Sequence, residues 1–169
     1  GDMTFTHCKI AESNRLPGAK NFKKVSKLLQ GGRIGIGWMA AGCARGALEA
    51  AYRYALNRKQ FGKPIASYQM MQQQLVEMTA QLTAIQTMMV YLAKEIDAGR
   101  KISTGQAASS KVFCTRACRE VVAKARSMLG GNGILLEYDV ARYFNDCEVL
   151  LTGEGTYEMN ILIAGKELT

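Results

Sequence analysis

One carboxylate, Glu154, stands between two glycines in the stretch TGEGTYEMN, residues 152–160, near the end of the chain. Glycines on both sides leave the backbone free and remove side-chain cover, so a substrate could reach this acid. Thr156 and Glu158 are also typical of a helix start, where acidic side chains are favourable. Two interpretations follow, a plain helix cap or a general base that takes a proton. The residues alone leave both open.

Two further motifs carry groups that could bind a phosphate. In RKQFG, residues 58–62, the planar guanidinium of Arg58 could hold a pyrophosphate, or Arg58 and Lys59 could simply offset a helix dipole. In LGGNG, residues 129–133, the glycines could expose backbone N–H groups to a phosphate or ribityl oxygen, or simply end a helix. The spacing is not GxGxxG and no strand is predicted before it, which excludes a Rossmann fingerprint.

The sequence gives little indication of nucleophilic catalysis by serine or cysteine, or of metal binding. His7 is the only histidine, so serine and cysteine triads and mixed Cys/His zinc sites have no candidate. The five cysteines form no CxxC motif, and their odd number argues against a disulfide framework and favours a reducing compartment. Cys114 and Cys118 share one helix face, as small buried residues do. We expect no metal site, and any catalysis should rest on a carboxylate.

Composition limits the class of protein. The 169 residues are enough for one domain with a core, and 48% of them are hydrophobic. The formal net charge of +8 favours anionic partners such as phosphate-bearing cofactors or substrates. The basic residues are scattered and lack interleaved aromatics, so we expect no nucleic-acid binding. We expect a soluble protein without a membrane span or a signal peptide.

The hydrophobic periodicity predicts a largely helical chain. Residues 3–10, with β-branched and aromatic side chains, predict one short strand, and a loop with a Pro-Gly turn follows it. Helices are predicted over residues 21–58, 67–98 and 104–129, with shorter ones over 138–149 and about 156–166. Ser103 and Thr156 are the predicted N-caps of the third long helix and of the last helix.

The second long helix has the clearest pattern in the sequence. Its apolar residues recur at spacings of four and three, as in a heptad seam: Met71, Leu75, Met78, Leu82, Ile85, Met89, Leu92 and Ile96. Such a seam is typical of helices that cross at about 20°. The opposite side is also partly apolar, so we expect burial on two sides and hence an oligomer. The predicted fold is all-α, an up-down bundle of the four-helix type with three long helices and two short ones, preceded by one short β-strand.

Four stretches in this order resemble the acyl-CoA dehydrogenase family, most closely its glutaryl-CoA dehydrogenase branch. They are Arg33, YALNRKQFGKPIASYQ over residues 54–69, ARSMLGGNGI over 125–134 and EGTYEMNILIAGKELT over 154–169. The likeness covers nearly the whole chain, but only the carboxyl-terminal part of such enzymes. Residues 1–18 resemble the end of their β-domain, and residues 19–169 resemble their C-terminal helical bundle domain.

The resemblance implies a flavin-dependent oxidoreductase that dehydrogenates an acyl-CoA between its α and β carbons, with FAD as cofactor. Glu154 would be the catalytic base that removes the α-proton, and its backbone N–H would help to polarise the thioester carbonyl. Some members carry the base one residue before the arginine that matches Arg33. Here that residue is Gly32, which cannot act as a base. Arg33 and Gly155 would lie beside the substrate.

The resemblance also implies the contacts to FAD. Arg58 would hold the pyrophosphate, and Gln69 would reach the adenine half. The remaining cofactor contacts would come from two short stretches: Ser127, Met128, Leu129, Gly130, Gly131, Thr156 and Glu158. In this family some of these contacts cross a subunit interface, which implies a homo-oligomer, a tetramer built as a dimer of dimers. Two positions depart from the family pattern, because Gly153 replaces a residue that is usually aromatic and Ser127 replaces an acid or amide.

Partners and setting follow from the same resemblance. It implies an acyl-CoA substrate, electron-transfer flavoprotein as the electron acceptor, and a place in fatty acid or amino acid catabolism. The compartment would be the mitochondrial matrix in a eukaryote and the cytoplasm otherwise. Two alternatives stay open: an acyl-CoA oxidase-like flavoenzyme, or an inactive self-associating helical bundle. We expect the 169 residues alone to be inactive, because the β-domain that covers the flavin lies outside them.

Overall fold

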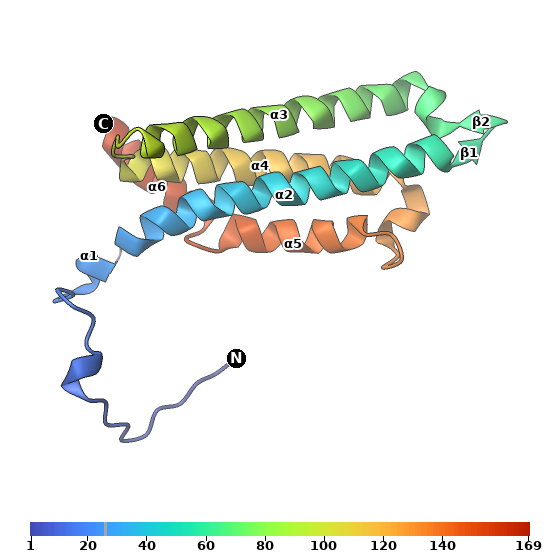
Figure 1. Cartoon of the computed structure of the whole chain (residues 1–169). Helices are drawn as coiled ribbons and strands as arrows, with labels where there is room; N and C mark the ends of the chain where they lie inside the picture. The colour runs from blue at the N-terminus through green and yellow to red at the C-terminus, as the bar shows by residue number, and fades with distance from the viewer. Residues whose placement is uncertain (26) are drawn as a thin grey trace.

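The computed structural model describes residues 1–25 and 27–169, most of which form a helical bundle (Figure 1). Its helices are α1 (Phe22–Val25), α2 (Lys27–Asn57), α3 (Gln69–Asp97), α4 (Thr104–Met128), α5 (Val140–Thr152) and α6 (Tyr157–Leu168). A two-stranded hairpin of β1 (Lys59–Gln60) and β2 (Lys63–Pro64) joins α2 to α3. Successive helices from α2 to α5 run in alternating directions (Figure 1). The predicted all-α, up-down bundle is therefore confirmed, and only residue 26 of the first predicted helix lies outside the described residues.

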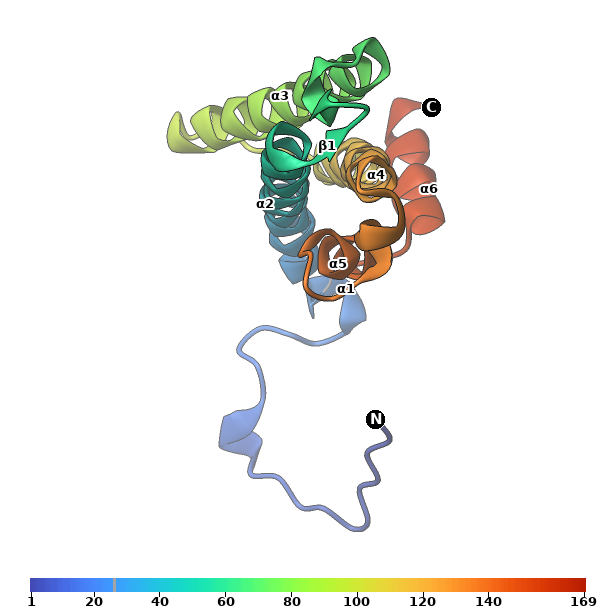
Figure 2. The same ribbon diagram turned by 90° about the vertical axis from the view of Figure 1, so that its right-hand side faces the viewer.

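Helix α4 is the centre of the bundle. It packs against α2, α3, α5 and α6, while α2 also packs against α3 and α5 (Figure 2). Small side chains let α2 come close to its neighbours, since its fully buried core residues are alanines: Ala40, Ala44, Ala47, Ala51 and Ala55. At Gly46 the contact is closer still, because a Cβ there would lie 2.5 Å from the ring of Tyr143 on α5. The small residues of α2 thus set its spacing to α5.

The heptad seam of α3 faces the core through its middle part. Five of its members are buried: Met78, Leu82, Ile85, Met89 and Leu92. Ile96, in the last turn of the helix, is 46% exposed, so the predicted seam is wrong at that end. The other side of α3 leaves Val76 and Tyr91 exposed. The expectation that a second copy covers this side stays a prediction.

Two predicted N-caps are confirmed. The Ser103 hydroxyl accepts a hydrogen bond from the backbone N–H of Gln106 at 3.0 Å, and the Gln106 side chain accepts one from Ser103 N at 2.8 Å. This reciprocal pair is a capping box. Thr156 caps α6, and its hydroxyl accepts from the N–H of Met159 at 3.3 Å. Helix α5 begins and ends a few residues later than predicted.

The predicted strand over residues 3–10 is wrong. The first 18 residues are all exposed and contain one 3-10 turn, Glu12–Asn14, and no strand. Figure 1 shows this segment leading away from the bundle. A strand needs a neighbouring strand to bond with and a face to bury, and this segment has neither within the described residues. The proposed boundary after residue 18 stays a prediction. Among the described residues, no helix is long and apolar enough to cross a membrane.

Candidate functional site

Glu154 lies on a sharp turn between α5 and α6. Its backbone has a φ of 57°, in the left-handed region that a glutamate rarely adopts, and the following Gly155 has a φ of 90°. The side chain of Glu154 is exposed. Thr156 makes the capping bond of α6, so Glu154 is not needed as a cap. The structure thus supports an accessible acid at this position over a plain helix cap.

The Glu154 carboxylate lies directly against α2 at Gly32. A Cβ added at Gly32 would come within 2.6 Å of Glu154 Oε2 and 2.8 Å of its Cδ. The two positions that the resemblance gave as alternative sites for the base are therefore neighbours in space. A side chain at position 32 would have to displace the carboxylate, and the glycine leaves room for it.

Two buried cations lie behind the Glu154 turn. Arg33 is 6% exposed, and no hydrogen-bond partner for its Nε is found among the described residues. Lys111 on α4 is fully buried, and its Nζ donates to the carbonyl oxygens of Leu151 at 3.0 Å and Gly155 at 2.8 Å. Burial and the nearby Arg33 lower the pKa of Lys111, while the carboxylates of Glu154 and Glu158 act in the opposite direction.

Sequence reasoning gave no site role to Lys111 or to Asn160, a buried residue of α6 whose Nδ2 donates to Gly155 O at 2.8 Å. The sequence did contain an indication for Lys111, because it falls on the same apolar helix face as Ala107, Cys114 and Cys118. A charged residue at a core position predicts a buried partner. For Asn160 no signal was available, because polar residues near a helix start are common.

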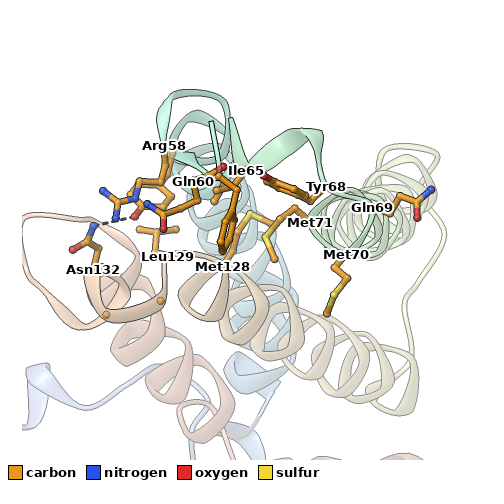
Figure 3. Close-up of a pocket in the computed structure, with 14 residues that line it drawn as sticks. Arg58, Gln60, Ile65, Tyr68, Gln69, Met70, Met71, Met128, Leu129 and Asn132 are labelled. Atoms are coloured by element: carbon orange, nitrogen blue, oxygen red, sulfur yellow. Dashed lines mark hydrogen bonds between the residues drawn. The ribbon is translucent and has the colours of Figure 1, made fainter. Parts of the chain in front are cut away.

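A second region lies at the hairpin end of the bundle, where a cavity of about 790 Å³ opens between β1, the start of α3 and the end of α4 (Figure 3). Six of the predicted cofactor residues line it: Arg58, Gln69, Met128, Leu129, Gly130 and Gly131. Ser127 is exposed and does not line this cavity, which fits its departure from the family pattern. Thr156 and Glu158 lie at the Glu154 turn instead.

The two regions lie at opposite ends of α2. Arg33 is near the first turns of this helix, and Arg58 follows its last residue, Asn57. At 1.5 Å per residue the two arginines are roughly 37 Å apart along the helix. The two candidate regions are therefore far apart on one chain.

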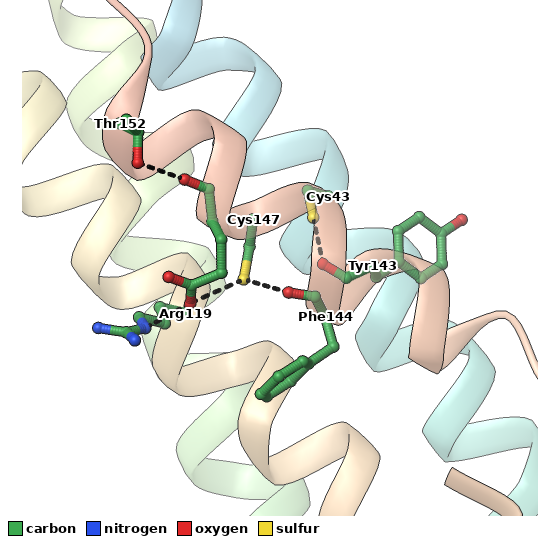
Figure 4. A network of polar contacts seen from close by, with 7 residues as sticks. Cys43, Arg119, Tyr143, Phe144, Cys147 and Thr152 are labelled. Carbon is green, nitrogen blue, oxygen red and sulfur yellow. Dashed lines mark hydrogen bonds and ion pairs between the residues drawn. The ribbon is translucent and has the colours of Figure 1, made fainter. Parts of the chain in front are cut away.

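A polar network ties α5, the helix before the Glu154 turn, to α2 and α4 (Figure 4). The Cys43 thiol on α2 donates to Tyr143 O at 3.6 Å, and Arg119 on α4 forms an ion pair with Glu148 at 2.6 Å. Cys147 donates to Phe144 O at 3.1 Å within α5. These contacts fix the helix from which the turn begins.

Three of the cysteines, Cys114, Cys118 and Cys147, are buried structural residues. Cys114 and Cys118 are fully buried, as predicted from their spacing. Burial raises the pKa of Cys114 to about 12 and also raises the pKa of Cys147 to about 12. These thiols stay protonated at neutral pH and make poor nucleophiles. Among residues 1–25 and 27–169, no group of three His, Cys, Asp or Glu side chains is arranged to hold a metal ion.

Comparisons with known proteins show the family to which this chain is similar. A protein-family model described as "Acyl-CoA dehydrogenase, C-terminal domain" matches residues 22–169. The chain is 35% identical over 163 residues to the caffeyl-CoA reductase-Etf complex subunit CarC of Acetobacterium woodii, covering 96% of this chain and 43% of that protein. Glutaryl-CoA dehydrogenase from Mycobacterium smegmatis superposes with a TM-score of 0.88 at 39% identity, covering 93% of this chain and 40% of that one.

A second structure of a glutaryl-CoA dehydrogenase from Mycobacterium smegmatis, in complex with FADH2, gives a TM-score of 0.86 at 35% identity. It covers 90% of this chain and 39% of that one. The chain thus spans less than half the length of each of these relatives.

Proposed function

The chain belongs to the acyl-CoA dehydrogenase family and matches its C-terminal domain, and from this premise we propose that it is the FAD-binding and oligomerisation domain of a flavin-dependent acyl-CoA dehydrogenase. The glutaryl-CoA dehydrogenase branch is favoured by the 39% identity to a structure of that enzyme. One observation carries the proposal: the Glu154 carboxylate is exposed and lies against Gly32 on a turn built for access.

In this proposal Glu154 is the general base. Its carboxylate takes the α-proton of an acyl-CoA thioester, and its backbone N–H donates to the thioester carbonyl, which makes that proton more acidic. The absence of side chains at Gly153 and Gly155 leaves clearance for a flat thioester. Gly155 and Arg33 are the residues that would lie nearest the substrate in this proposal.

The hairpin-end cavity has the donor set that FAD requires. Arg58 offers a planar, charged fork for a pyrophosphate, and Gln69 offers an amide for the adenine half. Nothing lies within 4 Å of the positions where Gly130 and Gly131 would carry a Cβ, so their backbone is open to a ligand. Phe61, on the hairpin, is 94% exposed and adds apolar surface. FAD, when bound, accepts the β-hydrogen of the substrate as hydride.

The separation of the two regions supports an oligomer in which chains share their cofactors. The Glu154 end of one chain would face the flavin that the Arg58 end of another chain holds. The exposed apolar side chains on the outer side of α3, such as Val76 and Tyr91, support a helical interface there. A tetramer built as a dimer of dimers is the assembly we propose.

Electron-transfer flavoprotein is the proposed electron acceptor. The relative from Acetobacterium woodii is named as a subunit of a reductase-Etf complex. That name also points to the reverse reaction, in which the same carboxylate would return a proton to the α-carbon. We therefore propose the reaction class, transfer of hydrogen at the α and β carbons of an acyl-CoA, in either direction.

The proposal is tested by Glu154→Gln in the full-length protein that contains this chain. The amide cannot take a proton, so we expect turnover to fall by ~10²–10⁴-fold while the flavin absorption of the purified protein is unchanged. Glu137→Gln is the matched control, because it makes the same change at an exposed glutamate before α5, outside the Glu154 turn. Turnover retained in Glu154→Gln would place the base elsewhere.

A further inference from the structure

Lys111 is a buried cation without a part in the proposed reaction. None of its surface is exposed, and a lysine is almost never fully buried unless its ammonium has partners. Both partners are backbone carbonyl oxygens of the segment around Glu154: Leu151 O at 3.0 Å and Gly155 O at 2.8 Å. The first lies in the last turn of α5, and the second comes directly after Glu154.

Asn160 reinforces the same segment from α6. It is fully buried, and its Nδ2 donates to Gly155 O at 2.8 Å and to Thr156 O at 3.0 Å. Gly155 O thus accepts hydrogen bonds from buried side chains of two different helices. The carbonyl groups on both sides of Glu154 are directed into the bundle, while the Glu154 side chain lies outside it, against Gly32.

The turn needs such support. A left-handed φ at a glutamate is strained, and strained backbone persists only where the surroundings over-determine it. An ordinary helix cap would need only the bond to Leu151 O, which satisfies a free carbonyl in the last turn of α5. The second bond, to Gly155 O, reaches past Glu154 and fixes the residue between the two anchors.

We propose that Lys111 is a positioning residue for Glu154, because its ammonium joins the two carbonyls that bracket the turn and so holds the carboxylate against Gly32. This inference rests on the proposed function, which requires the Glu154 carboxylate to have a fixed position. The local charges agree with it, because the carboxylates of Glu154 and Glu158 raise the pKa of the Lys111 ammonium against the effect of burial.

The test compares Lys111→Met, which removes every donor, with Lys111→Gln, which keeps an amide donor and is the milder change. Amide hydrogen exchange is measured on the 169-residue chain, at the last turn of α5 and at Gly153, whose N–H donates to Val149 O. In Lys111→Met we expect exchange there to become ~10-fold faster or more, the effect of losing a hydrogen bond to a charged donor. Lys111→Gln should fall between wild type and Lys111→Met.

A matched control separates local from global loosening. Ile85→Ala truncates a fully buried side chain on α3, outside the turn, and lowers overall stability. We expect it to leave exchange at Gly153 unchanged relative to other α5 amides. In the flavin-loaded full-length protein, Lys111→Met should lower kcat ~10-fold or more with KM within about 2-fold, as expected for a misplaced base.

Three results would overturn the inference. They are wild-type exchange at the turn in both Lys111 variants, a turn that loosens while kcat is unchanged, and a turn that loosens equally in Ile85→Ala. Failure of the proposed function has a different signature, since Glu154→Gln would then keep its turnover. The exchange comparison needs no flavin or substrate. It therefore tests the role of Lys111 independently of the turnover result for Glu154→Gln.

Discussion

Gly32→Ala should improve the stability of the protein and damage its reaction at the same time. The new Cβ would lie 2.6 Å from Oε2, 2.8 Å from Cδ and 3.3 Å from Cγ of Glu154, all closer than van der Waals contact. These atoms belong to the end of a flexible, exposed side chain, so the clash is relieved by moving the carboxylate. We therefore expect the backbone of α2 to keep its position.

The two effects have separate magnitudes. Gly32 lies within α2, where replacing glycine by alanine stabilises a helix by up to about 1 kcal/mol. For a protein of this size that corresponds to a rise in Tm of about 2–4 °C. Displacing a catalytic group by about 1 Å costs on the order of 100-fold in rate. We therefore expect a higher Tm for the chain, and a ~100-fold lower kcat for the full-length enzyme.

Thermal unfolding followed by circular dichroism and steady-state rates with an acyl-CoA give the two quantities. Gly35→Ala is the control, because it lies on the same helix with nothing within 4 Å of its Cβ position. It should gain similar stability and keep its kcat. A Gly32→Ala enzyme with a wild-type kcat would refute the reasoning, since the carboxylate could then work from another position.

Three further predictions concern the chain itself. Purified alone, it should be colourless, because the hairpin-end cavity, the proposed FAD site, is open on this chain; a yellow preparation with flavin absorption bands would contradict this. A thiol reagent at pH 8 should label exposed Cys8 quickly and Cys114 and Cys147 only on unfolding, because a pKa of about 12 leaves almost no thiolate; rapid labelling of all five cysteines would disprove it. Ser103→Ala should destabilise the chain by about 1 kcal/mol in urea unfolding, through loss of the capping box with Gln106, and an unchanged midpoint would show that the cap is not used.

The helices could be predicted from the sequence because their signals are local. The seam from Met78 to Leu92 repeats within one element, and the Ser103 cap needs only the three residues that follow it. The strand over residues 3–10 was predicted wrongly for the opposite reason. Strand-forming side chains are a local property, but a strand forms only where another backbone lies beside it.

The residues of the candidate site could be proposed from the sequence, but their arrangement in space could not. The resemblance selected Glu154 and Arg58, and helix length alone places the two regions far apart. The contact between Glu154 and Gly32 is different, because it depends on how the end of α5 meets the start of α2. Lys111 shows the same limit, since its place on the buried face was visible but its partners are carbonyl oxygens, which no side-chain pattern reveals.

The length of α2 has a genetic consequence. If each reaction centre combines Glu154 of one chain with Arg58 of another, the two residues can be lost independently. Glu154→Gln chains still supply an intact Arg58, and Arg58→Ala chains still supply an intact Glu154. When the two inactive variants are mixed and reassembled, each mixed pair has two centres. One centre contains both substitutions, and the other contains the intact Glu154 of one chain and the intact Arg58 of the other. Such complementation between two inactive variants is the behaviour expected if each proposed cofactor site is shared between two chains.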